Sequence, residues 1–489
     1  DYSSFLVAGR PKTGQSLDEV RDLLLEEVAK LRGGDFDEKL IEATINNYKM
    51  QLMRSFEEND SRAILYVYSF ISGADWADEV ARIDRMSKIT KQDVVDWANK
   101  YLGPESYAII YKREGKDPDE QKIAAPKITP IVTNRDSQSE FLSEIQTSQV
   151  QPIEPVFVDY KKDMSQFEAQ PGIDVLYKKN ETNDIFTLIY VFNTGTENDP
   201  ALNLAFNYLS YLGTDKMTAE EIASEMYDIA CSFYMNAGAN QSSIQITGLS
   251  ENMGKAMEIV EGLIAGAQPN EEILQNLKGD MIKSRADAKL NQSRCFGALQ
   301  RYMIYGSDFI RRTTLTDPAL QGLTSEQLLA KIGDLMGKQH EVLYYGPQDE
   351  AEVKAALAAH HKVAADLQPL EKKFSTLQPT DENKVMLAQY DAKQLYYMQY
   401  SNRGEKFDLA ADPQITLYNE YFGGGMNTIV FQEMREARGL AYSAWANLAI
   451  PTNAKGDYYY MAFIATQNDK MQKAIEAFDE IINNMPESE

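Results

Sequence analysis

The sequence predicts an α+β fold made of repeated units, each of them a mostly antiparallel sheet covered by helices. Two observations predict it: segments recur at a nearly constant spacing, and runs of β-branched and aromatic residues alternate with amphipathic helical patterns. The 489 residues are enough for about two to four domains, each able to bury a core of its own.

The repeats define the organisation of the chain. Residues 89–111 align without a gap with residues 323–345, which lie 234 positions later. Two shorter pairs align at similar spacings: Gly73–Trp76 with Gly306–Phe309, and Ser3–Gly9 with Ser242–Gly248. A third copy, a strand followed by an amphipathic helix, begins at Asp457–Thr466. The chain therefore spans about two repeat periods.

Local patterns place the elements of the first part. Ser16 with Glu19 forms a capping box for a helix that reaches Leu31, and Thr90 caps a helix that carries Trp97. Other elements follow from apolar periodicity: helices over about 37–56 and 61–71, and strands over 3–9 and 107–111.

The same reading covers the second part. The predicted strands are 174–178, 185–194, 232–237, 243–247, 384–389 and 395–400. The predicted helices are 200–212, one capped by Thr218 with Glu221 that runs through about 230, 270–302 and 413–421. Gly423 to Gly425 then predict a tight corner before a last helix that ends near Gly439.

Charge and composition exclude several classes of function. A formal net charge of −25 repels phosphate backbones and anionic lipid, so we expect neither nucleic acid nor a membrane as a partner. No run approaches 18 apolar residues. The chain opens on Asp1-Tyr2-Ser3-Ser4 rather than on a targeting segment, so we expect further sequence upstream, and the compartment, periplasmic or cytoplasmic, stays open.

Cysteine and histidine are scarce. Cys231 and Cys295 cannot form a disulfide framework for a chain of this length and are predicted to be free thiols. The histidines are His340, His360 and His361. The last two are adjacent on a helical stretch, so their side chains should diverge rather than share a metal.

One long motif resembles a known family. Residues 421–428, which hold the triple glycine, and residues 431–443, from Phe431 to Ser443, are similar to the signature of the second domain type in the pitrilysin/insulinase family of zinc metallopeptidases. The repeated α+β units and the long linker fit the same family. The resemblance implies four homologous domains in two halves that close around a peptide chamber.

The resemblance also implies a domain assignment. On this phasing, residues 1–115 are the back part of a second domain and 116–155 are an interdomain linker, rich in proline and charge. Residues 156–362 would be a complete third domain, and 371–489 the front part of a fourth.

The family's catalytic motif, His-x-x-Glu-His, binds zinc and activates water. Aligning Gly213-Thr214 with the Gly-Thr that trails the motif puts Leu204, Asn207 and Tyr208 at its three functional positions. These side chains are unsuited to zinc and to base catalysis. We therefore expect no metal or cofactor in this chain and zinc in an N-terminal domain that the chain lacks.

The resemblance assigns substrate contact to Arg435 and Tyr442. A guanidinium and a phenol can hold a peptide carbonyl. Arg438 lacks the motif's support and is predicted to be structural. The three glycines follow a helix rather than a strand, so a phosphate-binding loop is not expected.

The resulting functional prediction is a non-catalytic part of a zinc peptidase that closes the chamber and binds peptide substrates, inactive by itself because it lacks His-x-x-Glu-His. Its partner would be its own catalytic N-terminal domain. Two alternatives stay open: a structural subunit of a larger complex, or a peptide-binding partner of a separate catalytic subunit. An acidic wall would favour basic peptides in extended form, with edge-strand pairing as the binding mode.

Overall fold

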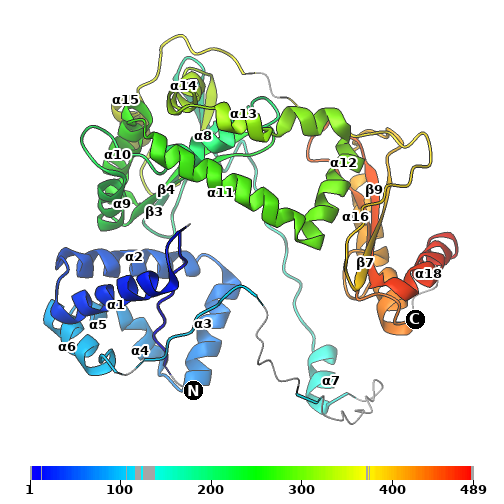
Figure 1. The fold of residues 1–489 in the computed structure, drawn as a ribbon, viewed down its shortest axis with the longest axis horizontal. Coiled ribbons are helices and arrows are strands. Elements are labelled where there is room, and N and C mark those ends of the chain that lie inside the picture. The colour runs from blue at the N-terminus through cyan, green and yellow to red at the C-terminus, as the bar shows by residue number, and fades with distance from the viewer. Residues whose placement is uncertain are drawn as a thin grey trace. The chain divides into compact units, whose positions relative to one another are not determined.

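The computed structural model describes residues 3–12, 14–105, 107–115, 123–124, 138–370, 373 and 375–485 (Figure 1). The chain divides into two compact units, Asp1–Ser165 and Gln166–Glu489. We call them unit 1 and unit 2 and describe each by itself.

The regular elements among the described residues 3–164 of unit 1 are helices. Its helices are α1 (Leu17–Gly33), α2 (Lys39–Ser55), α3 (Asn59–Ser72), α4 (Trp76–Val80), α5 (Arg82–Met86), α6 (Lys91–Tyr101) and α7 (Glu140–Thr147). The capping boxes of α1, from Ser16 and Glu19, and of α6, from Thr90 and Asp93, both form. The helix predictions in this part are therefore confirmed.

The two strands predicted in unit 1 are wrong for this structure. Ser3–Gly9 and residues 107–111 have no strand assignment where the structure describes them. A strand is stabilised by hydrogen bonds to a neighbouring strand, and strand propensity does not supply that neighbour. Both segments nevertheless contact helices. The rings of Phe5 and Trp97 meet edge to face, and Tyr111 Oη lies 3.0 Å from Asp18 Oδ1.

Half of the predicted linker lies outside the described residues. Of 116–155, the structure describes residues 123–124 and 138–155, and the latter contain α7, an element that the sequence reading missed. Ser139 caps α7 by accepting a hydrogen bond from Leu142 N–H.

The first sheet of unit 2 has six strands. They are β1 (Ser165–Gln170), β2 (Ile173–Lys179), β3 (Ile185–Phe192), β4 (Cys231–Ala237), β5 (Ser242–Leu249) and β6 (His340–Gly346), in the order β1-β2-β6-β3-β5-β4. Strand β3 is antiparallel to both of its neighbours, β5 and β6, and β5 is antiparallel to β4. The β2–β6 pair is parallel. The sheet is thus mostly antiparallel, as predicted.

Helices pack around this sheet and follow its strands along the chain. They are α8 (Leu202–Leu209), α9 (Ala219–Asp228), α10 (Met253–Gly266), α11 (Glu271–Lys289), α13 (Asp317–Gly322), α14 (Ser325–Met336) and α15 (Glu350–His360), whereas α12 (Gln292–Thr313) packs on the second sheet. The 3₁₀ turn η1 (Ser250–Asn252) precedes α10. Alternate residues of β3, including Leu188 and Tyr190, are fully buried in one core with the inner faces of α8, α10 and α14. The period-two pattern in the sequence reflects this burial.

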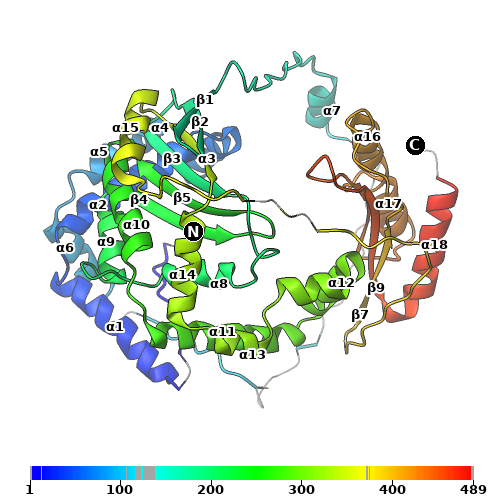
Figure 2. The same ribbon diagram turned by 90° about the horizontal axis from the view of Figure 1, so that it is seen from above.

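A second, three-stranded sheet follows in the order β7-β9-β8, with β7 (Gln394–Ser401), β8 (Ser443–Ala449) and β9 (Tyr459–Gln467). Its helical elements are α16 (Asp412–Phe422), α17 (Ile429–Phe431), the π-helix η2 (Gln432–Ala437), the 3₁₀ turn η3 (Asn468–Lys470) and α18 (Met471–Asn483). Figures 1 and 2 show α12 and α18 on opposite sides of this sheet. Phe296 of α12 contacts Phe463 on one face, and Phe478 of α18 packs into the core on the other.

Two element predictions in unit 2 need correction. Residues 384–389 form no strand, since their backbone has no ladder partner among the described residues. The predicted helix over 270–302 is two helices, because α11 ends at Lys289 and Asn291 caps α12 by accepting from Arg294 N–H. The spacing of apolar residues continues across the break between α11 and α12, so the sequence pattern does not reveal it.

The structure repeats as the sequence does. β5, η1 and α10 have the same order as β9, η3 and α18, and α1 in the same way follows Ser3–Gly9. Gly73 at the end of α3 and its counterpart Gly306 within α12 both have positive φ, 67° and 76°. The four-domain assignment of the repeats stays a prediction. No described helix is long and apolar enough to span a bilayer.

Candidate peptide-contact site

Arg435 and Tyr442 lie together in the structure. The guanidinium carbon of Arg435 is 5.4 Å from the centroid of the Tyr442 ring and 4.9 Å from that of Phe431, both within cation–π distance. Tyr442 is 71% exposed, and the Arg435 side chain is 42% exposed. The two residues predicted to contact substrate therefore form one accessible surface of a cation and a phenol.

Local backbone geometry brings the pair together. Arg435 lies on the π-helix η2, a geometry often found at functional sites. Gly439 then adopts φ +57°, a left-handed conformation that stops the helix, and its N–H donates to Arg435 O. Tyr442 N–H donates to Ala465 O of β9, which fixes Tyr442 directly before β8. The helix stop thus turns the chain so that Tyr442 faces back toward Arg435.

Arg438 has a different environment. Its Nη1 lies 2.8 Å from Glu480 of α18 and its Nε 3.3 Å from Glu433 of η2, and these carboxylates raise the pKa of its guanidinium. Arg435 forms a longer ion pair with its neighbour Glu436, at 3.6 Å. Arg438 connects η2 to α18, which agrees with its predicted structural role.

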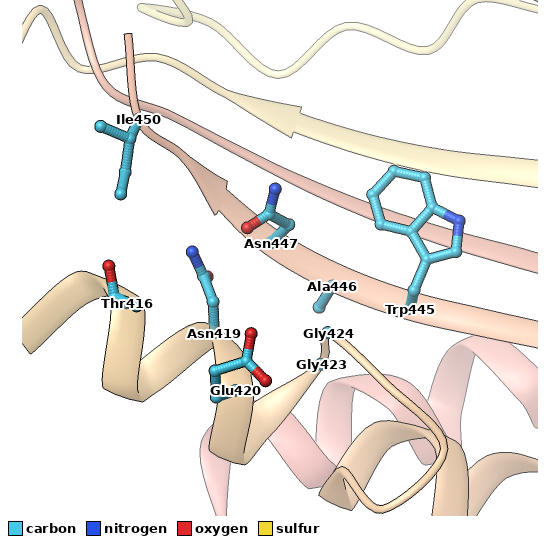
Figure 3. Close-up of a pocket in the computed structure, with 9 residues that line it drawn as sticks. All are labelled: Thr416, Asn419, Glu420, Gly423, Gly424, Trp445, Ala446, Asn447 and Ile450. Atoms are coloured by element: carbon cyan, nitrogen blue, oxygen red, sulfur yellow. The ribbon is translucent and has the colours of Figure 1, made fainter. Parts of the chain in front are cut away.

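A pocket of about 400 Å³ lies beside this region, between the end of α16 and strand β8 (Figure 3). Its lining residues are Thr416, Asn419, Glu420, Gly423, Gly424, Trp445, Ala446, Asn447 and Ile450. Neither Arg435 nor Tyr442 lines it. Gly423 forms the corner predicted from the glycine run, because a Cβ atom there would come within 2.2 Å of Ala446 O. The glycine allows the corner to approach the strand closely.

The chain itself occupies part of the outer edge of β8. Leu448 N–H donates to Asn419 Oδ1 at 2.9 Å, and Asn419 Nδ2 donates to Leu448 O at 3.0 Å. Ala446 N–H donates to Gly423 O at 3.3 Å. At these positions an extended peptide would have to displace an existing hydrogen bond. Edge-strand pairing at β8 therefore competes with α16.

The three positions aligned with the zinc motif lie on α8. Leu204 and Tyr208 are buried, whereas Asn207 is exposed and donates its side-chain N–H to Asn203. Among the residues that the structure describes, no group of three or more His, Cys, Asp or Glu side chains is arranged to hold a metal ion. Leu204, Asn207 and Tyr208 on α8 therefore do not fit a zinc ion.

Tyr208 has a structural role instead. Asn270 N–H donates to the phenol oxygen at 2.7 Å, and that oxygen lies 2.8 Å from Ser325 Oγ. Ser325 N–H in turn donates to Glu271 Oε1, which lowers the pKa of that carboxyl. The network joins α8 to the first turns of α11 and α14. A hydroxyl thus connects three helices at a position that the sequence alignment matches to a histidine of the motif.

Two histidines meet a glutamate in the core of unit 2, which the sequence reading missed. His340 Nδ1 lies 2.8 Å from Lys338 O, His340 Nε2 lies 2.8 Å from His361 Nε2, and His361 Nδ1 lies 2.6 Å from Glu261 Oε1. Lys338 O can only accept, so Nδ1–H of His340 donates to it. In the neutral imidazole of His340 the other nitrogen, Nε2, then accepts a hydrogen bond from His361 Nε2–H. Residues on β6 and just after α15 come together only through the fold.

Burial lowers the pKa of His340 to about 4, so its imidazole is neutral at pH 7. His360, the third histidine, lies apart from this network: its Nε2 is 3.4 Å from the place of a Cβ at Gly254. The predicted divergence of His360 and His361 agrees with this arrangement. Both cysteines are free, as predicted, and burial raises the pKa of Cys231 to about 12.

Comparison with known proteins finds similarity to zinc proteases. Residues 336–488 match the peptidase M16 inactive domain. The chain is 23% identical over 266 residues to an uncharacterised zinc protease of Streptomyces coelicolor, covering 50% of this chain and 56% of that protein. It is 21% identical over 290 residues to an uncharacterised zinc protease of Rickettsia felis, covering 57% and 67% of the two chains.

Solved structures share the fold. The peptidase M16 inactive domain from Pseudomonas fluorescens aligns with a TM-score of 0.54 at 18% identity over 66% of this chain and 80% of that one. The periplasmic protease PqqL from Escherichia coli aligns with a TM-score of 0.54 at 12% identity, over 95% and 54%. The ferredoxin protease FusC, solved with Arabidopsis ferredoxin, aligns with a TM-score of 0.52 at 11% identity, over 96% and 52%.

The chain spans 56% of the Streptomyces relative and 54% of PqqL, so it corresponds to little more than half of either protein. The profile match, the zinc protease relatives and the shared α+β fold agree with the resemblance found in residues 421–443. Residues 336–488 therefore match the peptidase M16 inactive domain, and the chain is similar to a non-catalytic, peptidase-like portion of the zinc proteases that its sequence resembles.

Proposed function

We propose that this chain binds peptide substrates and closes the chamber of an M16 zinc peptidase whose zinc and catalytic residues lie in another domain or subunit. One observation supports the proposal most strongly. The Arg435 guanidinium and the Tyr442 phenol, matched to the family signature, lie together and are accessible to solvent. Leu204, Asn207 and Tyr208 do not supply a zinc site, so the hydrolytic step is assigned elsewhere.

The chemistry of the pair suits a peptide main chain. A guanidinium donates several hydrogen bonds in a fixed plane, and the phenol can donate or accept one more. The rings of Phe431 and Tyr442 hold the guanidinium in place before a ligand arrives, which reduces the entropy lost on binding. We infer that Arg435 and Tyr442 hold substrate carbonyl oxygens. A protein substrate is suggested by FusC, which was solved with ferredoxin.

Peptide binding to the full chain tests the pair. Fluorescence anisotropy with a labelled, lysine-rich, unstructured peptide should show weaker binding by about ten-fold or more for Arg435→Ala, because a hydrogen bond to a charged donor is lost. Tyr442→Phe should cost less, about three-fold, because it removes a neutral hydroxyl. The matched control is Arg311→Ala, whose side chain is 79% exposed on α12.

Unchanged affinity in Arg435→Ala and Tyr442→Phe, with intact circular dichroism, would show that this pair does not bind substrate. Arg435→Lys adds a finer readout, because it keeps the charge and removes the planar fork. We expect Arg435→Lys to recover only part of the affinity.

A second experiment tests whether zinc binding and catalysis lie outside this chain. Zinc content and peptide hydrolysis are measured for the chain alone and after addition of an M16 subunit that carries His-x-x-Glu-His. Zinc and cleavage are expected only in the mixture. Stoichiometric zinc and cleavage by the chain alone would contradict the proposal.

A further inference from the structure

Strand β8 is an outer edge of the second sheet, whose described strands have the order β7-β9-β8. The first sheet contains the same arrangement in β3-β5-β4, with antiparallel pairing throughout, and there β4 is an outer edge of all six strands. The position of β8 at an edge is therefore a property of the repeated unit. An edge strand presents backbone N–H and C=O groups that can pair with another strand.

One side chain of α16 covers part of this edge. Leu448 N–H donates to Asn419 Oδ1 at 2.9 Å, and Asn419 Nδ2 donates to Leu448 O at 3.0 Å. A carboxamide offers the same donor and acceptor as a peptide group. In an antiparallel ladder a hydrogen-bonded pair of residues exchanges the same two bonds. Asn419 therefore occupies the edge of β8 as one residue of a neighbouring strand would.

The next position along this edge is also occupied. Ala446, two residues before Leu448, donates its N–H to Gly423 O at 3.3 Å. Residues two apart in an antiparallel strand direct their backbone groups to the same side. The end of α16 thus supplies partners at two successive positions of β8, by a side chain at Leu448 and by the main chain at Ala446.

The backbone around Asn419 fixes the amide in this place. Its main-chain O accepts from Gly423 N–H at 3.1 Å and from Gly424 N–H at 2.8 Å, so the same residue ends α16. Figure 3 shows the Asn419 side chain reaching from α16 towards β8. The space beside this edge is the pocket of about 400 Å³, which would leave room for an added chain if the amide were absent.

The first sheet has a related contact at the matching position. Tyr460 of β9 and Ser242 of β5 both lie eight residues before the 3₁₀ turn that follows their strand, and they pair with Leu448 and Ala237, respectively. Asn203 of α8 donates its side-chain N–H to Ala237 O at 3.4 Å. In both sheets an asparagine on the preceding helix thus bonds the same place on the edge strand, more closely and with two bonds in the second sheet.

We propose that Asn419 is a latch on the edge of β8: its carboxamide takes the place of a strand and prevents this edge from pairing with another extended polypeptide. A peptide held at Arg435 and Tyr442 would then bind without strand addition at β8. The latch involves only the α16 side chain and the backbone of β8, so this inference does not depend on the proposed substrate site.

The test uses the full chain and a labelled synthetic peptide with the sequence 459–467, the antiparallel neighbour of β8, with lysines added at both ends. A scrambled peptide of the same composition measures binding that comes from charge alone. By fluorescence anisotropy the parent chain should bind both peptides equally. Asn419→Ala should bind the ordered peptide about ten-fold tighter than the parent does, because Leu448 N–H and O become available.

Hydrogen exchange followed by mass spectrometry locates the bound peptide. In Asn419→Ala the ordered peptide should slow exchange in Ser443–Ala449 and leave exchange in Cys231–Ala237 unchanged. An ordered peptide that is N-methylated at alternate residues, on the side that would face β8, should lose the gain in affinity, because it cannot donate to the edge.

Matched variants separate the latch from other effects. Thr416→Ala alters another side chain of α16 that lines the pocket and makes no hydrogen bond to β8 in the described part of the chain, so no gain is expected. Asn419→Asp keeps an acceptor for Leu448 N–H and loses the donor to Leu448 O, so its gain should be smaller than that of Asn419→Ala.

Two further checks concern folding and the substrate site. Asn419→Ala keeps the main-chain O that ends α16, so its circular dichroism should match that of the parent. The gain should persist when Arg435→Ala is added to Asn419→Ala, which separates this test from that of the peptide-contact pair.

Three results would overturn the proposal: equal binding of the ordered peptide to the parent and to Asn419→Ala, an equal gain in Thr416→Ala, or a gain without protection of Ser443–Ala449. Sedimentation velocity without peptide shows whether Asn419→Ala self-associates. A dimer that the ordered peptide dissociates would support the latch, and a dimer that the peptide leaves intact would contradict it.

Discussion

At the scale of single residues, Tyr208 shows how a position aligned with a metal ligand can take a structural role. Its ring is fully buried, and its hydroxyl lies between Asn270 of the α11 cap and Ser325 of α14. A histidine at this place would not reproduce the same hydrogen bonds. Stability of the three-helix junction therefore depends on the hydroxyl.

The variant Tyr208→Phe tests this role. It keeps the ring and leaves Asn270 N–H and Ser325 Oγ without their partner, which should lower the free energy of unfolding by about 1–3 kcal/mol. Urea denaturation followed by circular dichroism measures the change. Asn207→Ala is the control, since this exposed neighbour should change stability by less than about 0.5 kcal/mol. Equal stability of the two variants would contradict the structural role.

The buried histidine pair predicts a dependence of stability on pH. Burial lowers the pKa of His340 to about 4 in the folded chain, from the 6.5 that is usual for histidine. Between these values the unfolded chain binds more protons, so the free energy of unfolding falls as the pH drops from about 6.5 towards 4. The groups that face His340 are His361, Glu261 through it, and the rings of Tyr190 and Phe192.

We expect a loss on the order of 1–2 kcal/mol between pH 7 and pH 5 from this residue. The measurement is the free energy of unfolding at both pH values for the parent and for His340→Gln. The difference in pH dependence between the parent and His340→Gln gives the contribution of His340 and leaves out that of the carboxyl groups. A variant with the same pH dependence as the parent would assign the loss to other groups.

At the scale of elements, the contact of the α16 corner with β8 decides the shape of the pocket in Figure 3. Gly423 permits it, since a Cβ atom there would lie 2.2 Å from Ala446 O and 2.7 Å from Ala446 N. Both are backbone atoms of a strand, so the strand or the corner must move. Gly425, two residues on, has nothing within 4 Å of its Cβ position.

Gly423→Ala should therefore destabilise the chain by about 1–3 kcal/mol, as overpacking does elsewhere. Gly425→Ala is the matched control and should change the free energy of unfolding by less than about 1 kcal/mol. Thermal denaturation of both variants checks the difference. If the two variants have the same melting temperature, the close approach of Gly423 to Ala446 does not restrict which residue this corner accepts.

At the scale of the whole molecule, the net charge of −25 governs which peptides approach. Affinity for a lysine-rich peptide should exceed that for a glutamate-rich peptide of the same length, and the difference should shrink as salt rises. The reason is screening, because the Debye length falls from about 10 Å at 0.1 M to about 3 Å at 1 M salt.

Titrations by fluorescence anisotropy across this range of salt measure the effect. A neutral peptide of the same length serves as the control and should change least. Affinity that depends neither on salt nor on peptide charge would contradict electrostatic selection.

The sequence by itself determined the α+β class, most helices and the repeat. Capping residues such as Ser16 and Thr90 act within one turn, and the period of apolar residues is a local property, so both can be read without a fold. The family resemblance came from a local motif too. Its signature residues Arg435 and Tyr442 are separated by a single helix stop. For that reason the sequence alone could predict that both contact substrate.

Tertiary structure alone decided the features that need distant partners. The strands predicted at Ser3–Gly9 and 107–111 have strand propensity, but a ladder requires a neighbour that the chain does not place there. His340, His361 and Glu261 meet from separate elements, and Tyr208 finds its partners on α11 and α14. Hydrogen bonds over such sequence separations depend on packing, and no local pattern in the sequence encodes them.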